Sequence, residues 1–404
     1  MDLSLTETQQ LLKAGVEEFI ARESPRESII ELADTETGYS RDAWKTAAEI
    51  GWLGMAIPER YGGSGNTLTD VAVVFEALGH GPVPGPFFSS GVLSAHMLLT
   101  LGDEAQKTAY LPRIASGDAV FAVAITEPDW AWGTEGVQLR VHRHGNSYGL
   151  DGTKLFVYDA ITADYLITAV RTGDNPTDIG FLIVDTTLPG VSIRRIDGFL
   201  TSECEVIFDN VEVPGDALLG GSASGLGGFE VALRRSTPVL CAYKVGGAQA
   251  VYDMSVEYSR ERVQFGQPIG RFQHVQNHIV QLVNHLDSAR WTTYEALWKI
   301  DAGKPDQDLS VHLAKAVTSE GFVQATNYAH EVHAGVGVMR EYGLILFTQL
   351  SRSLYHALGD PKYHRRKLAD LLVHYEPALA SDRGNGVGPG LIAPRVTTPR
   401  PPPM

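Results

Sequence analysis

The sequence predicts a multi-domain α+β fold with a helical N-terminal domain, a middle β-sandwich or small barrel, and a C-terminal four-helix bundle. Two changes in hydrophobic periodicity predict it: helical spacing gives way to two-residue spacing near residue 119, and helical spacing returns near residue 226. A chain of 404 residues has room for several domains. We therefore place the domains at residues 1–118, 119–225 and 226–375, and expect residues 376–404 to be a disordered tail.

The first 118 residues follow helical patterns. Thr6 and Gln9 have the spacing of a capping box, and apolar residues follow at helical intervals over 12–20. Glycine and proline punctuate the later segments. Further helices are predicted over residues 41–50, 68–78, 89–101 and 103–116.

The middle segment is built from short β-branched or aromatic runs, most of them separated by Gly, Asp, Asn or Pro. Such runs predict strands over residues 120–125, 147–150, 154–157, 165–170, 180–184, 191–196 and 204–213. The last 150 residues of the folded part instead predict long helices joined by short loops, which is the pattern of a four-helix bundle. These helices are predicted over residues 228–259, 271–302, 308–334 and 344–374. The Gly- and Pro-rich composition of the tail cannot bury enough apolar surface to order it.

Composition excludes several classes of function. There are 33 Lys and Arg against 48 Asp and Glu, a net charge of −15, whereas a nucleic-acid or anionic membrane surface needs a basic footprint. No apolar run is long enough for a transmembrane helix. The two cysteines, Cys204 and Cys241, form no disulfide framework, so we expect a reduced, cytoplasmic protein. P-loop, Rossmann and nucleophile-elbow motifs are absent, and no metal site is expected.

Three separated stretches carry chemical information. Residues 124–128 (AITEP) end a predicted strand, where Thr126 offers a hydroxyl group and a backbone N–H. Residues 258–273 join two long helices, and Arg262, Gln264 and Phe265 there suit the binding of phosphate oxygens and a flat ring. Residues 330–342 contain glycines that permit close backbone approach. Taken singly, these stretches are equally explained as a strand-ending turn, a helix–helix turn and a helix cap.

Taken together, these stretches resemble the acyl-CoA dehydrogenase family. The resemblance includes the Gly-rich run at 51–63, the run at 152–157 with Ala163-Asp164, the Arg-x-x-Phe-Gly and Pro-Ile-Gly-x-Phe-Gln motifs within 262–273, and His-x-Gly-x-Gly at 333–337. It covers about residues 1–375 in the family's order. It implies the three-domain architecture described above and an oligomer, either a homo-oligomer or a hetero-oligomer.

The resemblance also implies an FAD cofactor. Ile125 and Thr126 would face the flavin ring, with Phe156 and Tyr158 along its other side. Arg262, Gln264 and Phe265 would reach the diphosphate and adenine half of an FAD held mainly by a neighbouring subunit. The other side of that shared site would come from Gln273, Glu331 and Gly335, although most relatives have Gln where this chain has Glu331.

The implied chemistry is removal of the α-proton of an acyl-CoA thioester and transfer of a hydride from the β-carbon to flavin N5. A desolvated carboxylate suits the first step, because burial raises its pKa towards that of a useful base. An electron-transfer flavoprotein would then accept the electrons. We expect no nucleic-acid or membrane partner.

The catalytic base departs from the family pattern. The two positions where relatives carry a glutamate base align with Ser236 and Leu358. Three explanations remain open: a base hidden by a one-turn shift of the alignment, a base-lacking partner subunit of a heteromeric dehydrogenase, or a flavin monooxygenase-like reaction on the same fold. The ending at 358–365 resembles actinobacterial subunits of heteromeric steroid side-chain dehydrogenases, and the sequence leaves the catalytic residue unassigned.

Overall fold

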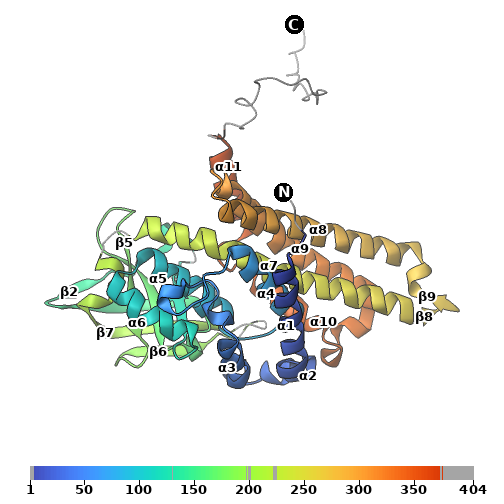
Figure 1. Ribbon diagram of the computed structural model, residues 1–404, viewed down its shortest axis with the longest axis horizontal. Helices are drawn as coiled ribbons and strands as arrows, with labels where there is room; N and C mark the ends of the chain where they lie inside the picture. The colour runs from blue at the N-terminus through green and yellow to red at the C-terminus, as the bar shows by residue number, and fades with distance from the viewer. Residues whose placement is uncertain are drawn as a thin grey trace, which may run out of the picture.

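The computed structural model describes residues 4–129, 131–196, 198, 202–221, 225–373 and 375. Two β-sheets lie at one end of the molecule, long helices extend to the other end, and the N-terminal helices pack alongside (Figure 1). The predicted fold class is therefore confirmed. Residues 376–404, for which we expect disorder, lie outside the described residues. Within the described part of the chain, no helix combines the length and apolar character needed to cross a membrane.

The N-terminal helices begin at the predicted capping box. The Gln9 backbone N–H donates to Thr6 Oγ1 over 3.3 Å, and the Thr6 N–H donates to Gln9 Oε1 over 3.0 Å. A π-helical turn, Ser89–Ser94, runs directly into α5. The α-helices are α1 Glu7–Glu23, α2 Arg26–Leu32, α3 Arg41–Glu49, α4 Leu68–His80, α5 Ala95–Leu101 and α6 Glu104–Ala115.

Two glycines let the N-terminal domain approach the bundle closely. A Cβ on Gly79 of α4 would lie 1.9 Å from the Tyr243 carbonyl oxygen, and a Cβ on Gly246 would lie 1.8 Å from that of Glu76. Any side chain at either position would force the two backbones apart. Helix α4 therefore packs directly on the first bundle helix, α7 (Leu226–Glu261).

The middle domain consists of a three-stranded sheet, in the order β1-β4-β5, and a four-stranded sheet, in the order β2-β3-β7-β6. Strand β1 is parallel to β4, and the other pairings are antiparallel. Residues 147–150 and 154–157, predicted as two strands, belong to one strand with irregular pairing around Gly152. The strands are β1 Phe121–Ala124, β2 His142–His144, β3 Ser147–Tyr158, β4 Tyr165–Arg171, β5 Ile179–Asp185, β6 Val191–Arg195 and β7 Glu203–Pro214.

The bundle differs from the prediction in its fourth segment, which is broken. Helix α7 is followed by α8 Gln273–Asp301 and α9 Gln307–His333, and then by two shorter helices, α10 Leu344–Ser353 and α11 Pro361–Val373. Leu358 (φ 58°) and Gly359 (φ 97°) turn the chain between them. Pro361 then starts α11, as suits a residue that has no backbone N–H. A short β-hairpin joins α7 to α8. Its two strands, β8 Val263–Gln264 and β9 Gln267–Pro268, have two residues each.

Candidate active site

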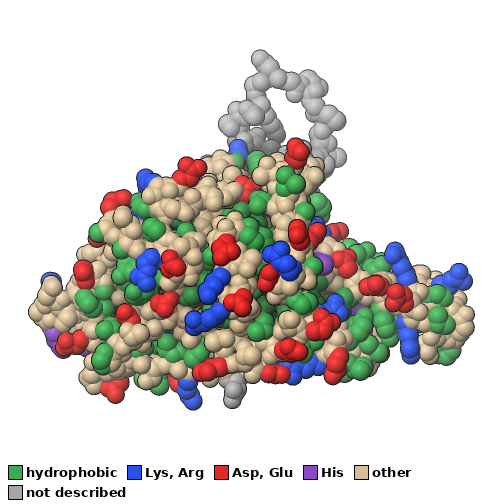
Figure 2. Space-filling model, turned by 60° about the horizontal axis from the view of Figure 1, so that its bottom comes forward, with side chains coloured by type: hydrophobic (Ala, Val, Ile, Leu, Met, Phe, Trp, Pro, Cys, Tyr) green, Lys and Arg blue, Asp and Glu red, His purple; other side chains and the backbone are tan. Residues whose placement is uncertain are grey.

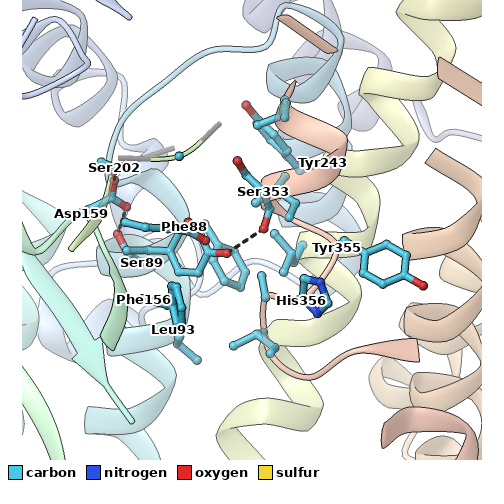
Figure 3. Close-up of a pocket in the computed structure, with 18 of the residues that line it drawn as sticks. Phe88, Ser89, Leu93, Phe156, Asp159, Ser202, Tyr243, Ser353, Tyr355 and His356 are labelled. Atoms are coloured by element: carbon cyan, nitrogen blue, oxygen red, sulfur yellow. Dashed lines mark hydrogen bonds between the residues drawn. The ribbon is translucent and has the colours of Figure 1, made fainter. Parts of the chain in front are cut away.

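A cavity of about 1000 Å³ lies where the three parts of the chain meet. Its lining comes from α2, α4 and the π-helical turn, from β1, β3 and the segment around β6–β7, and from α7 and the α10–α11 turn. Most of the lining is apolar or aromatic, as in pockets for small organic ligands. Figure 3 shows the side chains that project from these elements towards one another.

A buried ion pair fixes one wall of this cavity. Lys154 of β3 is fully buried, and its Nζ donates to Glu127 Oε1 over 2.6 Å and to the Ile125 carbonyl oxygen over 3.1 Å. Glu127 also accepts from the backbone N–H groups of Gln138 and Leu139. Burial lowers the pKa of Lys154 to about 8, although Glu127 opposes that shift. The end of β1 is thereby held against β3.

Ile125, Thr126, Phe156 and Tyr158 all line the cavity, so the residues expected beside a flavin ring do come together. Phe156 has φ 55°, which is rare for an aromatic residue and is typical of constrained functional sites. The Tyr158 hydroxyl donates to the Ser353 carbonyl oxygen over 2.9 Å, and burial raises the pKa of Tyr158 well above its usual value. This hydrogen bond, dashed in Figure 3, ties the sheet to the end of α10.

The opposite wall is the α10–α11 turn, which Lys315 of α9 supports from beneath. Lys315 Nζ donates to the Gly359 carbonyl oxygen over 2.8 Å and to that of Tyr355 over 3.4 Å. Ser319 Oγ accepts from both Lys315 and Lys244, each over 2.9 Å. Burial lowers the pKa of Lys315 to about 8 and that of Lys244 well below its usual value.

The two aligned base positions lie in different places. Leu358 is in the cavity wall, on the α10–α11 turn. Ser236 is completely buried outside the cavity lining, 2.9 Å from His96 Nδ1. His356, two residues before Leu358, also lines the cavity, and burial lowers its pKa, which favours the neutral imidazole.

The remaining predicted flavin contacts lie outside the cavity of this chain. They are exposed on the β8–β9 hairpin, the start of α8 and the end of α9, at the end of the bundle away from the sheets (Figure 1). Phe265 is 92% exposed and has φ 54°. Within one chain the predicted residues therefore form two separate groups, the outer one being Arg262, Gln264, Phe265, Gln273, Glu331 and Gly335.

The structure adds polar residues that the sequence pattern did not single out. Ser89, Asp159, Ser202 and Ser353 all line the cavity. Ser89 and Ser202 donate hydrogen bonds to the Asp159 carboxylate. Asp159 directly follows the strand residue Tyr158, which could have drawn attention to it. The serines lie far apart in sequence and carry no such signal.

The residues present fit a flavin. Ser353 Oγ and Trp132 Nε1 are buried without a hydrogen-bond partner among the described residues, and both residues line the cavity. Orphaned polar atoms of this kind are usually satisfied by a ligand or by water. Two backbone-strained aromatic residues, Phe156 and Phe265, stand where the flavin ring and the nucleotide half of FAD are expected.

On the face drawn in Figure 2, acidic and basic side chains are interspersed.

Comparison with known proteins gives the same family for all three parts of the chain. Residues 6–118 match the acyl-CoA dehydrogenase N-terminal domain, residues 122–211 the middle domain and residues 224–373 the C-terminal domain. The probable acyl-CoA dehydrogenase YngJ of Bacillus subtilis (strain 168) is 31% identical over 353 residues, covering 85% of this chain and 92% of YngJ.

Solved structures agree with this match. The ChsE4–ChsE5 complex from Mycobacterium tuberculosis has a TM-score of 0.84 at 26% identity, covering 93% of this chain and 100% of that one. PigA, solved with FAD and proline, has a TM-score of 0.84 at 25% identity, covering 92% of this chain and 99% of that one. The chain therefore belongs to the acyl-CoA dehydrogenase family of oxidoreductases.

Proposed function

We propose that the protein is an FAD-dependent acyl-CoA dehydrogenase that forms a 2,3-enoyl-CoA by removal of an α-proton and transfer of a β-hydride to flavin N5. The observation that carries the proposal is the cavity itself. Its wall joins Ile125 and Thr126, which directly follow β1 of one sheet, to Phe156 and Tyr158 of β3 in the other sheet, opposite the α10–α11 turn. Its volume of about 1000 Å³ is at the upper end of ordinary ligand sites, as a flavin ring beside an acyl group requires.

FAD, when bound, supplies the hydride acceptor. The chain's own residues would position it: Ile125 and Thr126 on one side of the ring, Phe156 and Tyr158 on the other. Arg262, Gln264 and Phe265 from a second subunit would hold the diphosphate and adenine, with Gln273, Glu331 and Gly335 at the same boundary. Arg is suited to this role because its guanidinium group binds phosphate oxygens through two parallel hydrogen bonds.

The apolar lining supports proton removal by excluding water. A carboxylate in such surroundings has a raised pKa and is a stronger base. The carboxylates on the described part of the cavity wall belong to Asp159, Glu203 and Asp360. Asp360 caps α11, since the Tyr363 N–H donates to its Oδ1 over 2.7 Å. Asp159 accepts from two serines, and Glu203 interacts with Tyr158, so none of the three is a free base at the aligned position.

A second candidate function is that of a base-lacking partner subunit in a heteromeric acyl-CoA dehydrogenase. Two placements favour it: Leu358 presents an apolar side chain to the cavity, and Ser236 lies outside the lining. Such a chain would complete a flavin site at which the partner subunit supplies the catalytic base. The similarity to the ChsE4–ChsE5 complex is consistent with this candidate.

One experiment tests both candidates. The purified chain, loaded with FAD, is supplied with acyl-CoA thioesters and an electron-transfer flavoprotein, and the enoyl-CoA product is measured by mass spectrometry. Turnover by the chain alone supports the first candidate and contradicts the idea that this chain lacks a catalytic base. Turnover only after co-expression with a base-bearing homologue supports the second candidate. Absence of product in both arms contradicts the proposed function.

Substitution of Leu358 tests the base position directly. If the chain alone is inactive because that position is apolar, Leu358→Glu should create measurable dehydrogenation. Leu358→Gln is the matched control, because it has a similar shape without a basic carboxylate. Equal activity of the two variants would contradict the assignment of the vacancy to this position.

A further inference from the structure

Three residues form one hydrogen-bonded polar cluster on the cavity wall, most of which is apolar or aromatic. Ser89 Oγ donates to Asp159 Oδ2 over 2.5 Å, and Ser202 Oγ donates to Asp159 Oδ1. The Asp159 backbone N–H donates to the Ser202 carbonyl oxygen over 3.0 Å. Figure 3 shows this Ser89–Asp159–Ser202 cluster on the sheet side of the cavity, across from Ser353 and His356.

The cluster is assembled from distant segments under local backbone constraint. Ser89 begins the π-helical turn, an uncommon element that is often found at functional sites. Asp159 has φ 62°, in the left-handed region. Ser202 lies just before β7. Segments from the N-terminal domain and from two places in the β-domain thus converge on one carboxylate.

Nothing in the described structure neutralises this carboxylate. No Lys, Arg or His among the described residues forms an ion pair with Asp159. Arg195, which also lines the cavity, donates to the Thr35 carbonyl oxygen instead. Burial raises the pKa of Asp159 above its usual value. A buried carboxylate without an ion-pair partner is costly, so a core built only for stability would not favour it.

The hydrogen-bonding capacity of the cluster determines what could bind there. Both serine protons are already donated to Asp159. The remaining sites are lone pairs on the carboxylate and on the two serine oxygens, and lone pairs can only accept. A ligand group must therefore donate, as a hydroxyl does.

A second polar atom points to a ligand in the same cavity. Ser353 is 5% exposed, and its Oγ has no hydrogen-bond partner among the described residues. Apolar side chains of the same cavity, including those of Phe88, Leu93 and Phe156, lie near these polar groups (Figure 3). The cavity thus has apolar walls with hydrogen-bonding groups on two sides.

We propose that the Ser89–Asp159–Ser202 cluster is a specificity subsite that accepts a hydrogen bond from a hydroxyl group on the acyl chain, distant from the thioester. This inference rests on the proposed function, because it takes the cavity to be the acyl-CoA site. It specifies the substrate class as large, mainly apolar acyl groups that carry a hydroxyl.

The test compares ω-hydroxyacyl-CoA thioesters with unsubstituted acyl-CoA thioesters over a graded series of chain lengths. Dissociation constants are measured by calorimetry on the flavin-loaded protein, with its base-bearing partner if it needs one, and kcat/KM is measured in parallel. At the chain length that reaches the cluster, the hydroxylated compound should bind about 10-fold or more tightly, as expected for one buried hydrogen bond to a charged group.

Two variants assign that preference to the cluster. Asp159→Asn, which removes the charge and replaces one of the two acceptor oxygens with a donor NH2, and Ser89→Ala should each remove most of the preference while unsubstituted acyl-CoA still binds. Ser94→Ala is the matched control: Ser94 belongs to the same turn, but its hydroxyl donates to the Ser89 carbonyl oxygen and it does not line the cavity. It should keep the preference.

Two results would overturn the subsite: no preference for the hydroxyl at any chain length, or a preference that survives both cluster variants. Failure of the proposed function is a different result. In that case no thioester is oxidised, yet the calorimetric preference and its loss in Asp159→Asn still decide whether the subsite exists.

Discussion

Lys154 and Glu127 show how single residues hold the site together. Their side chains are almost fully buried and 2.6 Å apart, and they join β3 to the turn that carries Ile125 and Thr126. Removing one partner of a buried pair leaves the other charge without compensation, which costs far more than losing an exposed pair.

We therefore predict that Lys154→Met lowers the free energy of unfolding by about 3–5 kcal/mol, because it leaves Glu127 buried and unpaired. Lys13→Met is the control, since Lys13 and Glu17 form an exposed pair 3.9 Å apart. Its effect should stay under about 1 kcal/mol. Denaturant unfolding at a fixed protein concentration measures both effects. Equal effects of the two substitutions would show that the buried pair has no special structural role.

Lys315 gives a prediction for pH dependence. Burial lowers its pKa to about 8 in the folded chain, from 10.5. Between these two pH values the unfolded chain binds more protons at this site than the folded chain does. The contribution of Lys315 to the free energy of unfolding therefore increases as the pH rises from about 8 to 10.5.

Lys315→Met should remove this increase. Compared with the variant, the wild-type chain should gain stability over that pH range. Denaturant unfolding at several pH values measures the difference between the two. A difference that does not change with pH would mean that the Lys315 ammonium is not desolvated beneath the α10–α11 turn.

At the scale of elements, the β8–β9 hairpin is distinctive because its apolar side chains face solvent. Phe265 is 92% exposed and Val263 is 53% exposed. Exposed apolar side chains at a turn with strained backbone indicate a surface that binds something else. A cofactor shared with a second subunit, as we propose, would account for this exposure.

Arg262→Ala should weaken FAD retention, because the guanidinium group would no longer bind the diphosphate oxygens. The flavin-to-protein ratio after prolonged dialysis measures this, with about 10-fold weaker binding expected for one charge-assisted contact. Arg260→Ala, in the last turn of α7, is the matched control and should retain flavin. Full occupancy of the Arg262 variant after dialysis would reject the phosphate role.

Secondary structure was predictable from the sequence wherever periodicity was strong. The capping box at Thr6, the change to strands near residue 119 and the three long bundle helices all follow from local patterns. The fourth bundle segment was predicted as continuous, although Gly359 and Pro361 signalled the break. Long-range pairing was not predictable: no local pattern brings Ser89 to Asp159, or Lys315 to the carbonyl oxygen of Gly359.

At the scale of the whole molecule, the cavity exists only because three parts of one chain converge. The N-terminal domain supplies the π-helical turn, the β-domain supplies Phe156 and Asp159, and the bundle supplies the α10–α11 turn. The proposed nucleotide contacts lie at the opposite end of the bundle, so a second subunit would complete the proposed site. We therefore expect flavin binding to depend on oligomerisation.

The most direct measurement is an anaerobic titration of the flavin-loaded oligomer with acyl-CoA, monitored by flavin absorbance. The oligomer is taken both alone and with a base-bearing partner chain, and hydroxylated thioesters are included. We predict that the yellow absorbance is bleached in at least one of these preparations as a hydride passes to the flavin. A preparation that never acquires flavin, or a flavin spectrum that no acyl-CoA alters in either preparation, would contradict the proposal that flavin and acyl group share this cavity.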